Sequence, residues 1–298
     1  MEHEALIIGG GFAGLSAATV LARARRRVLV VDAGAPRNRF SSHAHNVIGH
    51  DGRSGAEILA DARAQFLRYD TAELMQGEVA SLTSEGEGFS ATLQDGRVAC
   101  ARKLVLATGV ADRLPNIAGA AERWGKTVLH CPYCHGYEIG AGRRIGVLGV
   151  NEHSARYAAL IADWGETVFF PGRLSLADEQ IELLHRRDLA IIPTPIEAIE
   201  GEAPAIDALR LADGRRISVD ALFVGSNVTM ASPLAEALGC AIDETPMGPI
   251  IRTDGQKRTT VPGVYAAGDA ARQPHSVAFA AADGMMAGLG AHHDLIGL

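Results

Sequence analysis

The sequence contains few aromatic residues, few cysteines and no long apolar run. Aromatic residues make up 5% of its 298 residues, and four residues are cysteines. A helix that crosses a bilayer needs about 20 consecutive apolar residues, and the chain has no such stretch. We therefore expect no membrane contact. The N-terminal residues MEHEALIIGG lack the basic region and cleavage site of a secretory signal, so we expect a cytoplasmic protein.

The chain also lacks the positive charge that is typical of nucleic-acid-binding proteins. Its formal net charge is −7 at pH 7, whereas binding to a phosphate backbone requires a basic face. The one basic cluster, Arg23 with residues 25–27, follows an apolar helical run. Cations at that position complement the helix dipole. We expect no nucleic-acid partner.

The residues that are abundant indicate a globular α/β chain. Apolar residues make up 47% of the sequence and charged residues 21%, a balance that is typical of globular proteins. The 34 glycines suit tight turns between strands and helices. A chain of 298 residues is long enough for two domains of ordinary size.

Two βαβ units predict the fold class. Apolar, β-branched runs at 5–10 and 27–34 flank an Ala/Leu-rich helix from Gly14 to about Arg23. The same pattern returns with strands at 143–149 and 166–170 around a helix over 154–164. Parallel strands joined by helices imply a doubly wound sheet. We therefore predict an α/β fold with two Rossmann-like dinucleotide-binding domains, the second inserted into the first.

Three further runs complete the strand prediction and locate the domain boundaries. Buried strands are expected at 103–109, 221–226 and 263–269. The run at 263–269 indicates a return to the first domain. We expect the first domain over residues 1–114 and 245–298. The inserted domain, which carries the C-x-x-C pair, is expected over 115–244.

A dinucleotide fingerprint follows the first predicted strand. Gly9, Gly11 and Gly14 fit G-x-G-x-x-G, and Asp32 ends the next strand. The first glycine permits a tight turn, the second lets the backbone approach a pyrophosphate, and the third lets helix and strand pack closely. The pyrophosphate then meets free N–H groups at the helix N-terminus. Asp32 is placed to accept hydrogen bonds from a ribose.

A C-x-x-C pair, Cys131 and Cys134, predicts thiol chemistry. Structural disulfides are rare in a reducing compartment, so this spacing indicates redox or metal chemistry there. One cysteine can attack an external sulfur while the other resolves the mixed disulfide. His135 is adjacent and titrates near neutrality, so it is a candidate proton shuttle. Cys100 and Cys240 are isolated, and we expect them to be packing residues.

Other interpretations of the cysteine pair remain open at this point. C-x-x-C-H is also the attachment pattern of c-type haem, which normally requires an exported chain. Zinc could be bound by the pair with His130 and His135, but a second ligand pair at zinc spacing is missing. An inert, buried pair is the third alternative. The neighbouring Pro132 and Gly136 favour an accessible turn at a helix start instead.

Over nearly its full length the chain resembles the low-molecular-weight thioredoxin reductase family. The resemblance rests on GGGFAG, Asp32, HNVIG (45–49), ATG (107–109), CPYC (131–134) and AAGD (266–269). It implies FAD in the first domain, a homodimer, and domains that rotate between flavin reduction and disulfide exchange. It also implies that Cys134 faces the flavin C4a while Cys131 exchanges with the substrate. The FAD contacts that it implies are Gly9, Gly11, Gly14, Asp32, Asn46, Val79, Thr108, Gly109, Gly268 and Asp269, the last on the ribityl chain.

The sequence departs from that family where NADPH would bind. The usual G-G-G-N-S-A becomes GVNEHS over 149–154. Gly149, Ser154 and Arg173 are the candidate NAD(P)H contacts, but Asn151 would crowd a pyrophosphate and Glu152 adds negative charge. Arg173 alone replaces a His-Arg-Arg segment, and a guanidinium is the natural partner of the 2′-phosphate. NAD(P)H binding and a vestigial domain both stay open.

CPYCHGYE and HNVIGHDG resemble one branch of the family in particular. That branch holds the flavin-dependent dithiol oxidases of holomycin, gliotoxin and romidepsin type. We predict an FAD-dependent thiol/disulfide oxidoreductase acting through Cys131 and Cys134, with NAD(P)H as electron partner. Its substrate would be a small dithiol or disulfide, or a thioredoxin-like protein. The alternatives are an NAD(P)H-independent dithiol oxidase that uses oxygen, and a flavin-bound redox sensor.

Overall fold

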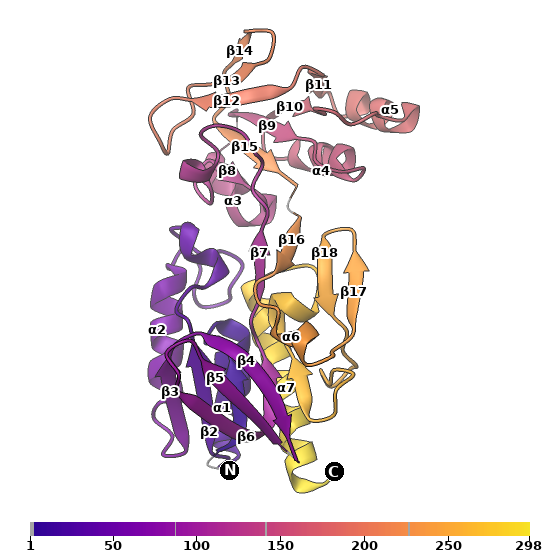
Figure 1. The fold of residues 1–298 in the computed structure, drawn as a ribbon. Coiled ribbons are helices and arrows are strands. Elements are labelled where there is room, and N and C mark those ends of the chain that lie inside the picture. The colour runs from indigo at the N-terminus through magenta and orange to yellow at the C-terminus, as the bar shows by residue number, and fades with distance from the viewer. Residues whose placement is uncertain (1–2, 87, 141, 226) are drawn as a thin grey trace. The chain divides into compact units, whose positions relative to one another are not determined.

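The structure, a computed structural model, describes residues 3–86, 88–140, 142–225 and 227–298, and they form two compact units (Figure 1). Unit 1 comprises Met1–Arg39, Gly55–Asp112 and Val228–Leu298. Unit 2 comprises Phe40–Ser54 and Arg113–Asn227. None of the described helices is both long and apolar enough to cross a membrane.

Unit 1 is built on a seven-stranded sheet. Its strand order is β3-β2-β1-β6-β5-β4, and β19 also pairs with β6. The strands β3, β2, β1, β6 and β19 are parallel, whereas β4 and β5 continue from β6 as an antiparallel meander. The strands are β1 (His3–Ile8), β2 (Val28–Asp32), β3 (Ala72–Gln76), β4 (Val79–Glu85), β5 (Gly88–Leu93), β6 (Val98–Leu106) and β19 (Val264–Ala266).

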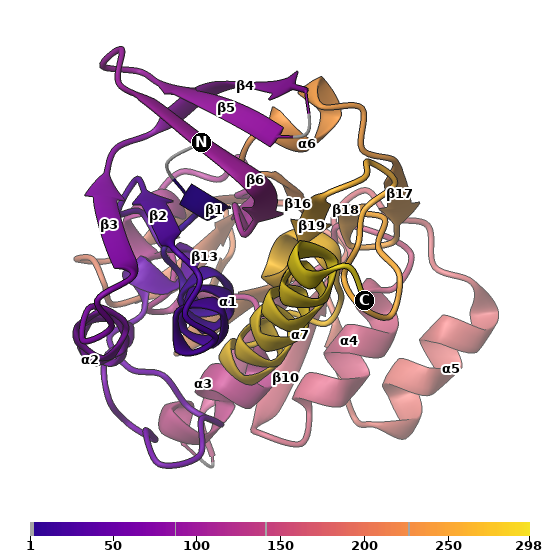
Figure 2. The ribbon, with the colours of Figure 1, turned by 90° about the horizontal axis from the view of Figure 1, so that it is seen from below.

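Helices α1 (Phe12–Arg23) and α7 (Val277–Ile296) lie side by side on unit 1's sheet (Figure 2). Glycines make this close approach possible, since a Cβ at Gly284 would lie 2.0 Å from the carbonyl oxygen of Ala13. Buried aliphatic residues of the central strands, such as Ile7 and Val30, fill the space beneath the helices. The remaining elements of unit 1 are α2 (Gly55–Phe66), α6 (Leu234–Ala237), η3 (Gly268–Ala271), the pair β7 (Val110–Asp112) and β16 (Val228–Met230), and the hairpin β17 (Ile242–Thr245) and β18 (Gly248–Ile251). The turn η1 (Arg37–Phe40) spans the boundary between the units.

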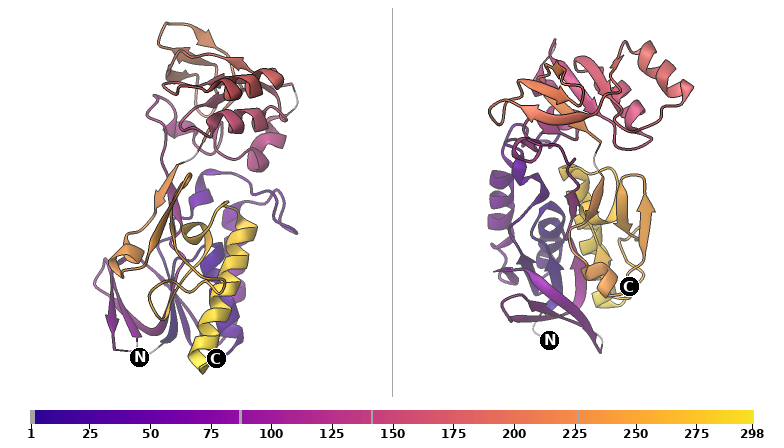
Figure 3. Two further views of the ribbon diagram at one scale, coloured as in Figure 1. Left: turned by 90° about the vertical axis from the view of Figure 1, so that its right-hand side faces the viewer. Right: turned by 45° about the horizontal axis from the view of Figure 1, so that its top comes forward.

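Unit 2 contains a five-stranded parallel sheet in the order β11-β10-β9-β15-β8 and a separate three-stranded antiparallel sheet, seen from two sides in Figure 3. Its core is formed by large buried side chains such as Phe169, Phe170 and Phe223. The parallel strands are β8 (Val128–Leu129), β9 (Arg144–Leu148), β10 (Glu166–Phe170), β11 (Ala190–Ile191) and β15 (Ala221–Val224). The other elements are β12 (Ile196–Glu200), β13 (Ala208–Leu211), β14 (Arg216–Ile217), α3 (Pro132–Ile139), α4 (Ser154–Ile161), α5 (Asp178–Arg186) and η2 (Ala121–Arg123).

The parallel strands at the centre of each unit's main sheet confirm the predicted α/β fold with two Rossmann-type units, one inserted into the other. The compact units differ in two places from the expected domain ranges of 1–114 with 245–298 and 115–244. Residues from Val228 onward belong to unit 1, because β16 pairs with β7 there. The segment Phe40–Ser54 belongs to unit 2, although its neighbours on both sides in the sequence belong to unit 1.

Candidate functional site

The glycine-rich loop of unit 1 has the geometry that the fingerprint predicts. Gly9 has a φ of +106°, and a Cβ there would lie 2.3 Å from the carbonyl oxygen of Ala107. A Cβ at Gly14 would lie 1.8 Å from the carbonyl oxygen of Gly9. A Cβ at Gly11, by contrast, would meet nothing within 4 Å. Packing therefore requires glycine at two of these positions, while Gly11 borders open space at the start of α1.

Asp32, at the end of β2, holds this loop in place. Its Oδ1 accepts a hydrogen bond of 3.0 Å from the main-chain N–H of Gly10. Its Oδ2 forms an ion pair with Arg63 Nη2 at 2.5 Å, and its side chain is largely buried. The carboxylate is thus positioned beside the loop by two partners, and its contact with a ribose remains a prediction.

Three other predicted FAD contacts of unit 1, Gly109, Gly268 and Asp269, lie around the same dinucleotide site as the glycine loop. Gly109 has a φ of +69°, and a Cβ there would meet nothing within 4 Å, so the turn after Thr108 also borders open space. Gly268 touches α1, since its Cβ would lie 2.8 Å from that of Ala13. These contacts place Asp269 near the glycine loop, at the edge where the parallel strands end. Ligands of open α/β sheets bind at that edge, so these residues fit a bound dinucleotide.

Val79 is a different kind of candidate. It begins β4, and its side chain is buried in unit 1's core beside Leu82. Its side chain is therefore a packing group. A contact between the main chain of Val79 and FAD remains a prediction.

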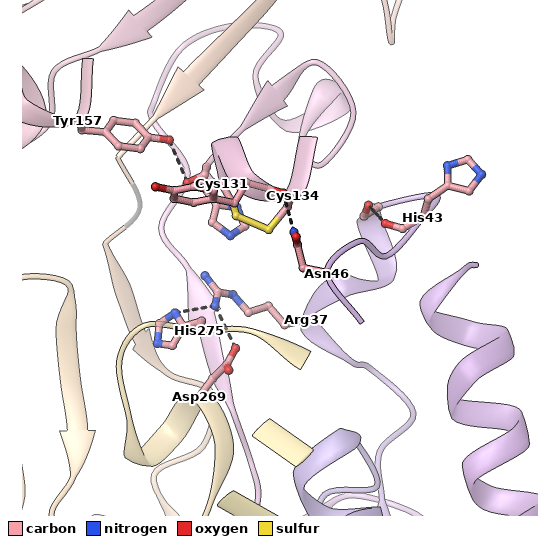
Figure 4. The surroundings of a disulfide bond; sticks show 11 residues. Arg37, His43, Asn46, Cys131, Cys134, Tyr157, Asp269 and His275 are labelled. Carbon is pink, nitrogen blue, oxygen red and sulfur yellow. Dashed lines mark hydrogen bonds and ion pairs between the residues drawn. A yellow bond between two sulfur atoms is a disulfide. The ribbon is translucent and has the colours of Figure 1, made fainter. Parts of the chain in front are cut away.

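In unit 2 the two cysteines of the C-x-x-C pair form a disulfide, with Cα atoms 5.3 Å apart (Figure 4). Cys131 is the N-cap of α3, and Pro132 occupies the first turn, where its missing N–H costs no hydrogen bond. The helix N-terminus favours negative charge and so favours the thiolate form of a reduced cysteine. The observed disulfide agrees with a redox pair, and the described residues contain no group of three or more potential metal ligands.

Aromatic residues fix the position of α3 in unit 2. Gly136 permits the contact, since a Cβ there would lie 2.4 Å from Trp164. Tyr133 meets the edge of the same indole at a centroid distance of 5.3 Å. On the other side of the pair, the carbonyl of His130 accepts a 2.9 Å hydrogen bond from the hydroxyl of Tyr157. Burial raises the pKa of the Tyr157 phenol, so it stays protonated and can donate this bond. The chain on both sides of the disulfide is therefore anchored.

The environment of His135 keeps its imidazole neutral at physiological pH. Burial lowers the pKa of His135, His45 lowers it further, and Glu138 opposes the shift. A neutral imidazole accepts a proton more readily than it donates one. At neutral pH His135 is thus suited to take a proton from a thiol next to it in sequence.

The segment Phe40–Ser54 is attached to α3 in unit 2. Asn46 Nδ2 donates a 2.7 Å hydrogen bond to the carbonyl of Tyr133 (Figure 4). His45 lies between two carboxylates, Glu138 at 3.3 Å and Asp51 at 3.2 Å. A contact between Asn46 and FAD stays a prediction; in the structure its side-chain amide binds the residue between the cysteines. The motif HNVIGHDG predicted a functional role for this segment. The two ion pairs of His45 leave no signal in the sequence.

The second dinucleotide loop, between β9 and α4, is closed by its own side chains. Ser154 Oγ accepts hydrogen bonds from the N–H groups of Val150 and Asn151, at 3.0 and 3.1 Å. Asn151 Oδ1 accepts the N–H of His153 at 3.0 Å. Gly149 is required by packing, since its Cβ would lie 3.0 Å from Pro171. The candidate Ser154 is therefore a structural cap of the loop, and Arg173 is exposed after β10.

A buried cluster around Arg37 in unit 1 was not expected from the sequence. The Arg37 guanidinium binds both oxygens of Asp112, at 2.9 and 2.5 Å, and Asp269 at 3.0 Å. It also lies 2.7 Å from His275 Nδ1 (Figure 4). These partners are 75 to 238 residues away in the sequence. No local pattern could have joined them.

Comparison with known proteins agrees with this geometry. The family description "Pyridine nucleotide-disulphide oxidoreductase" matches residues 3–284. Thioredoxin reductase tcpT of Claviceps purpurea is 35% identical over 301 residues, covering 96% of this chain and 92% of the relative. Thioredoxin reductase sirT of Leptosphaeria maculans is 31% identical over 311 residues, covering 99% and 94%.

Solved structures with the same fold cover nearly the whole chain. An oxidoreductase from Agrobacterium tumefaciens is 44% identical with a TM-score of 0.94, and 99% of each chain is covered. HlmI is 37% identical with a TM-score of 0.93, covering 99% of this chain and 93% of that one. The chain thus belongs to the pyridine nucleotide-disulphide oxidoreductase family, as a thioredoxin reductase-like, FAD-dependent disulfide oxidoreductase.

Proposed function

We propose that this enzyme is a dithiol oxidase: it closes a disulfide in a small dithiol and passes the two electrons to oxygen. The observation that carries this direction is the self-closed second dinucleotide loop in unit 2. A nicotinamide cofactor would need free N–H groups at the start of α4 to bind its pyrophosphate. The N–H groups of Val150, Asn151 and His153 are already bonded to side chains of the loop itself.

The charge of that loop and its hydrogen bonds to the rest of unit 2 also disfavour NAD(P)H binding. Glu152 adds a carboxylate whose side chain is 84% exposed, beside the place a pyrophosphate would take. Asn151 also bonds to Asn227 at 3.3 Å, which ties the loop to the chain after β15. Opening the loop for a dinucleotide would break these bonds and bring two negative groups together. NAD(P)H binding would therefore be weak.

The cysteine pair provides the exchange chemistry. A substrate thiolate attacks Sγ of Cys131, the bond to Cys134 breaks, and the Cys134 thiolate leaves. The second substrate thiol then attacks the mixed disulfide, releasing the substrate disulfide and the Cys131 thiolate. His135, neutral at physiological pH, accepts a proton from a reacting thiol. When bound, FAD supplies the acceptor that takes two electrons from the cysteine pair and passes them to oxygen, which becomes hydrogen peroxide.

Exposed apolar side chains near the disulfide support a small substrate. Tyr133 and Tyr137 on α3 are 64% and 87% exposed, and Ile48 on the attached segment is fully exposed. Such groups offer contact area to a small organic dithiol without requiring a docked protein. We keep the cytoplasmic location and the homodimer as predictions. Light scattering of the purified protein tests the homodimer.

The second candidate is an NAD(P)H-dependent disulfide reductase acting on a thioredoxin-like protein. Arg173 favours it, since it is exposed after β10 at the edge where a 2′-phosphate would bind. The names of the relatives tcpT and sirT are consistent with it. The redox-sensor alternative has no comparable support in the structure.

Anaerobic titration of the purified yellow protein separates these functions. The oxidase predicts that excess dithiol bleaches the visible absorbance of the flavin, through the Cys131–Cys134 pair, while NADPH and NADH do not. Readmitted oxygen should restore the colour. The Cys131→Ser variant is the matched control and should not bleach with the dithiol. Rapid bleaching by NADPH would overturn the oxidase in favour of the reductase. Bleaching without sustained oxygen or NAD(P)H consumption would support a sensor.

A further inference from the structure

His45, in the segment Phe40–Ser54 of unit 2, lies between two carboxylates. Its Nδ1 is 3.2 Å from Oδ1 of Asp51, and its Nε2 is 3.3 Å from Oε1 of Glu138 on α3. An ionised carboxylate only accepts hydrogen bonds, so both contacts are hydrogen bonds when each ring nitrogen carries a proton. In that protonated form His45 joins the two carboxylates and places a positive charge beside Glu138.

The position of His45 is fixed by the segment itself. Oδ1 of Asp51 also accepts the main-chain N–H of Asn46 at 3.3 Å, so Asp51 holds two consecutive residues. The main chain closes around them, because the N–H of Ala44 donates to the carbonyl of Arg53 at 2.8 Å. The side chain of His45 is only 18% exposed. His45 is therefore an oriented, largely buried group whose second ring nitrogen faces α3.

Glu138 connects His45 to the candidate proton acceptor, His135. Glu138 follows His135 by three residues in α3, and side chains at this spacing are neighbours on a helix surface. A carboxylate in that position stabilises the charged form of His135. Burial lowers the pKa of His135, Glu138 raises it, and His45 lowers it again. Among the described residues, the charges that act on His135 are therefore those of Glu138 and His45, and they oppose each other.

This opposition bears on the chemistry because His135 must be neutral to accept a proton. If Glu138 acted alone, more of His135 would be charged near neutral pH. A ring that already carries protons on both nitrogens cannot take another from a thiol. The segment Phe40–Ser54 thus brings a compensating cation to the redox-active helix.

We propose that His45 is a positioning residue for His135: it binds Glu138 and offsets the charge of that carboxylate, so that His135 remains a neutral base next to the cysteine pair. The inference rests on the proton-accepting role of His135 in the proposed function. It does not depend on which group takes or supplies the electrons, because the attacking sulfur must be a thiolate in either direction.

Titration of His135 by NMR tests this role directly. In ¹⁵N-histidine-labelled protein with the disulfide closed, the His135 resonances, assigned with His135→Gln, report its protonation at each pH. His45→Gln removes the charge, so the ratio of charged to neutral His135 at a given pH should rise about two- to fivefold, the effect expected of a partly exposed ion pair. His45→Lys retains a positive charge and should restore the ratio. His185→Gln, at an exposed site of α5, should match the wild type.

A double variant tests whether the effect passes through Glu138. When Glu138→Gln is added to His45→Gln, both opposing charges are absent, and the ratio should return close to the wild-type ratio. A ratio that His45→Gln leaves unchanged, or that His45→Lys fails to restore, would overturn the proposal. So would a double variant that keeps the raised ratio, since the charge of Glu138 would then not be its cause.

The pH dependence of disulfide opening tests the consequence for the chemistry. The rate at which dithiothreitol reduces the Cys131–Cys134 disulfide is compared with that of His185→Gln in the same buffers, which cancels the ionisation of the reagent. In His45→Gln the rate should begin to fall at a higher pH than in the wild type, because His135 becomes charged there. A raised NMR ratio with an unmoved pH profile would overturn the proton-accepting role of His135, and with it the purpose of the contact. An unchanged NMR ratio would overturn the contact's effect itself, so the two failures are distinguishable.

Discussion

The side-chain amide of Asn46 donates a 2.7 Å hydrogen bond to the main-chain carbonyl of Tyr133, the residue between Pro132 and Cys134. Asn46 adopts a φ of +60°, in the left-handed region. Asparagine tolerates this region better than other side chains except glycine. One residue thus provides both the turn of the segment Phe40–Ser54 and its attachment to the redox-active helix.

Replacing Asn46 should separate these two contributions. Both Asn46→Gly and Asn46→Ala remove the hydrogen bond, but only alanine retains a Cβ in a left-handed conformation. We expect Asn46→Ala to be about 1 kcal/mol less stable toward unfolding than Asn46→Gly. Urea denaturation followed by circular dichroism measures the difference. Equal stabilities would show that the turn relaxes without cost.

Two glycines of the first loop should respond in opposite ways to alanine. Gly14→Ala places a Cβ 1.8 Å from the Gly9 carbonyl oxygen, so we expect a loss of at least about 3 kcal/mol in folding free energy. Gly11→Ala meets no protein atom within 4 Å, so the apoprotein should unfold at nearly the wild-type temperature. The added methyl group would obstruct the FAD pyrophosphate instead. Thermal unfolding and FAD titration of both apoproteins test the contrast, and tight FAD binding by Gly11→Ala would contradict it.

Asp32→Ala should weaken FAD binding. It removes the acceptor for Gly10 N–H and leaves Arg63 without its carboxylate. A lost hydrogen bond to a charged group corresponds to about 1.5–3 kcal/mol, or roughly 10- to 150-fold in Kd. Asp95→Ala is the control, because Asp95 is exposed and binds Arg97 on the surface of the same unit. Flavin fluorescence quenching measures both dissociation constants, which should differ strongly if Asp32 has the assigned role.

Cys134→Ser should trap the first step of disulfide exchange. Cys131 then attacks a reactive aromatic disulfide, and no resolving thiol is available to release the product. Mass spectrometry should show one thiol adduct per chain on Cys131. Cys100→Ser, which leaves the pair intact, should turn over normally and retain no adduct on the pair. An adduct on Cys134 in the Cys131→Ser variant, formed equally fast, would mean that the two cysteines do not have distinct roles.

The depressed pKa of His135 predicts a loss of stability in acid. Its folded pKa lies below the unfolded value of about 6.5, so the unfolded chain binds more protons in that range. Stability is therefore complete above pH 6.5 and falls as the pH drops toward the folded pKa. Between pH 7.5 and 5.5 the wild type should lose more unfolding free energy than His135→Gln. His185→Gln, at an exposed site, should behave as the wild type does.

Local patterns predicted the parts of the fold that have local causes. The runs around Ile7, Val30 and Val147 are buried on both faces of parallel sheets, and such strands are recognisable as continuous apolar segments. Gly9 and Gly14 could be assigned because the physics of the turn demands glycine at those positions. The cysteine pair was found for the same reason, since its chemistry depends on a short spacing.

Long-range arrangements could not be predicted in this way. The ion pairs of Arg37 with Asp112 and Asp269 join the ends of separate strands, and only the completed sheet brings them together. The attachment of Asn46 to Tyr133 likewise crosses 87 residues. The contact-defined unit 1 resumes at Val228, whereas the sequence predicts the return near residue 245. The pairing of β16 with β7, which joins these residues to unit 1, leaves no mark in composition.

The membership of Phe40–Ser54 in unit 2 limits how this protein can be divided. A fragment of residues 113–227 alone would lack Phe40. The backbone of Phe40 packs closely on Gly125, since a Cβ at Gly125 would lie 2.9 Å from the Phe40 carbonyl group. It would also lack His45 and Asn46, the partners of α3. A stand-alone version of unit 2 would therefore need the segment Phe40–Ser54 attached to it. A chimera that exchanges only residues 113–227 would keep a Phe40–Ser54 segment whose side chains do not fit the new α3.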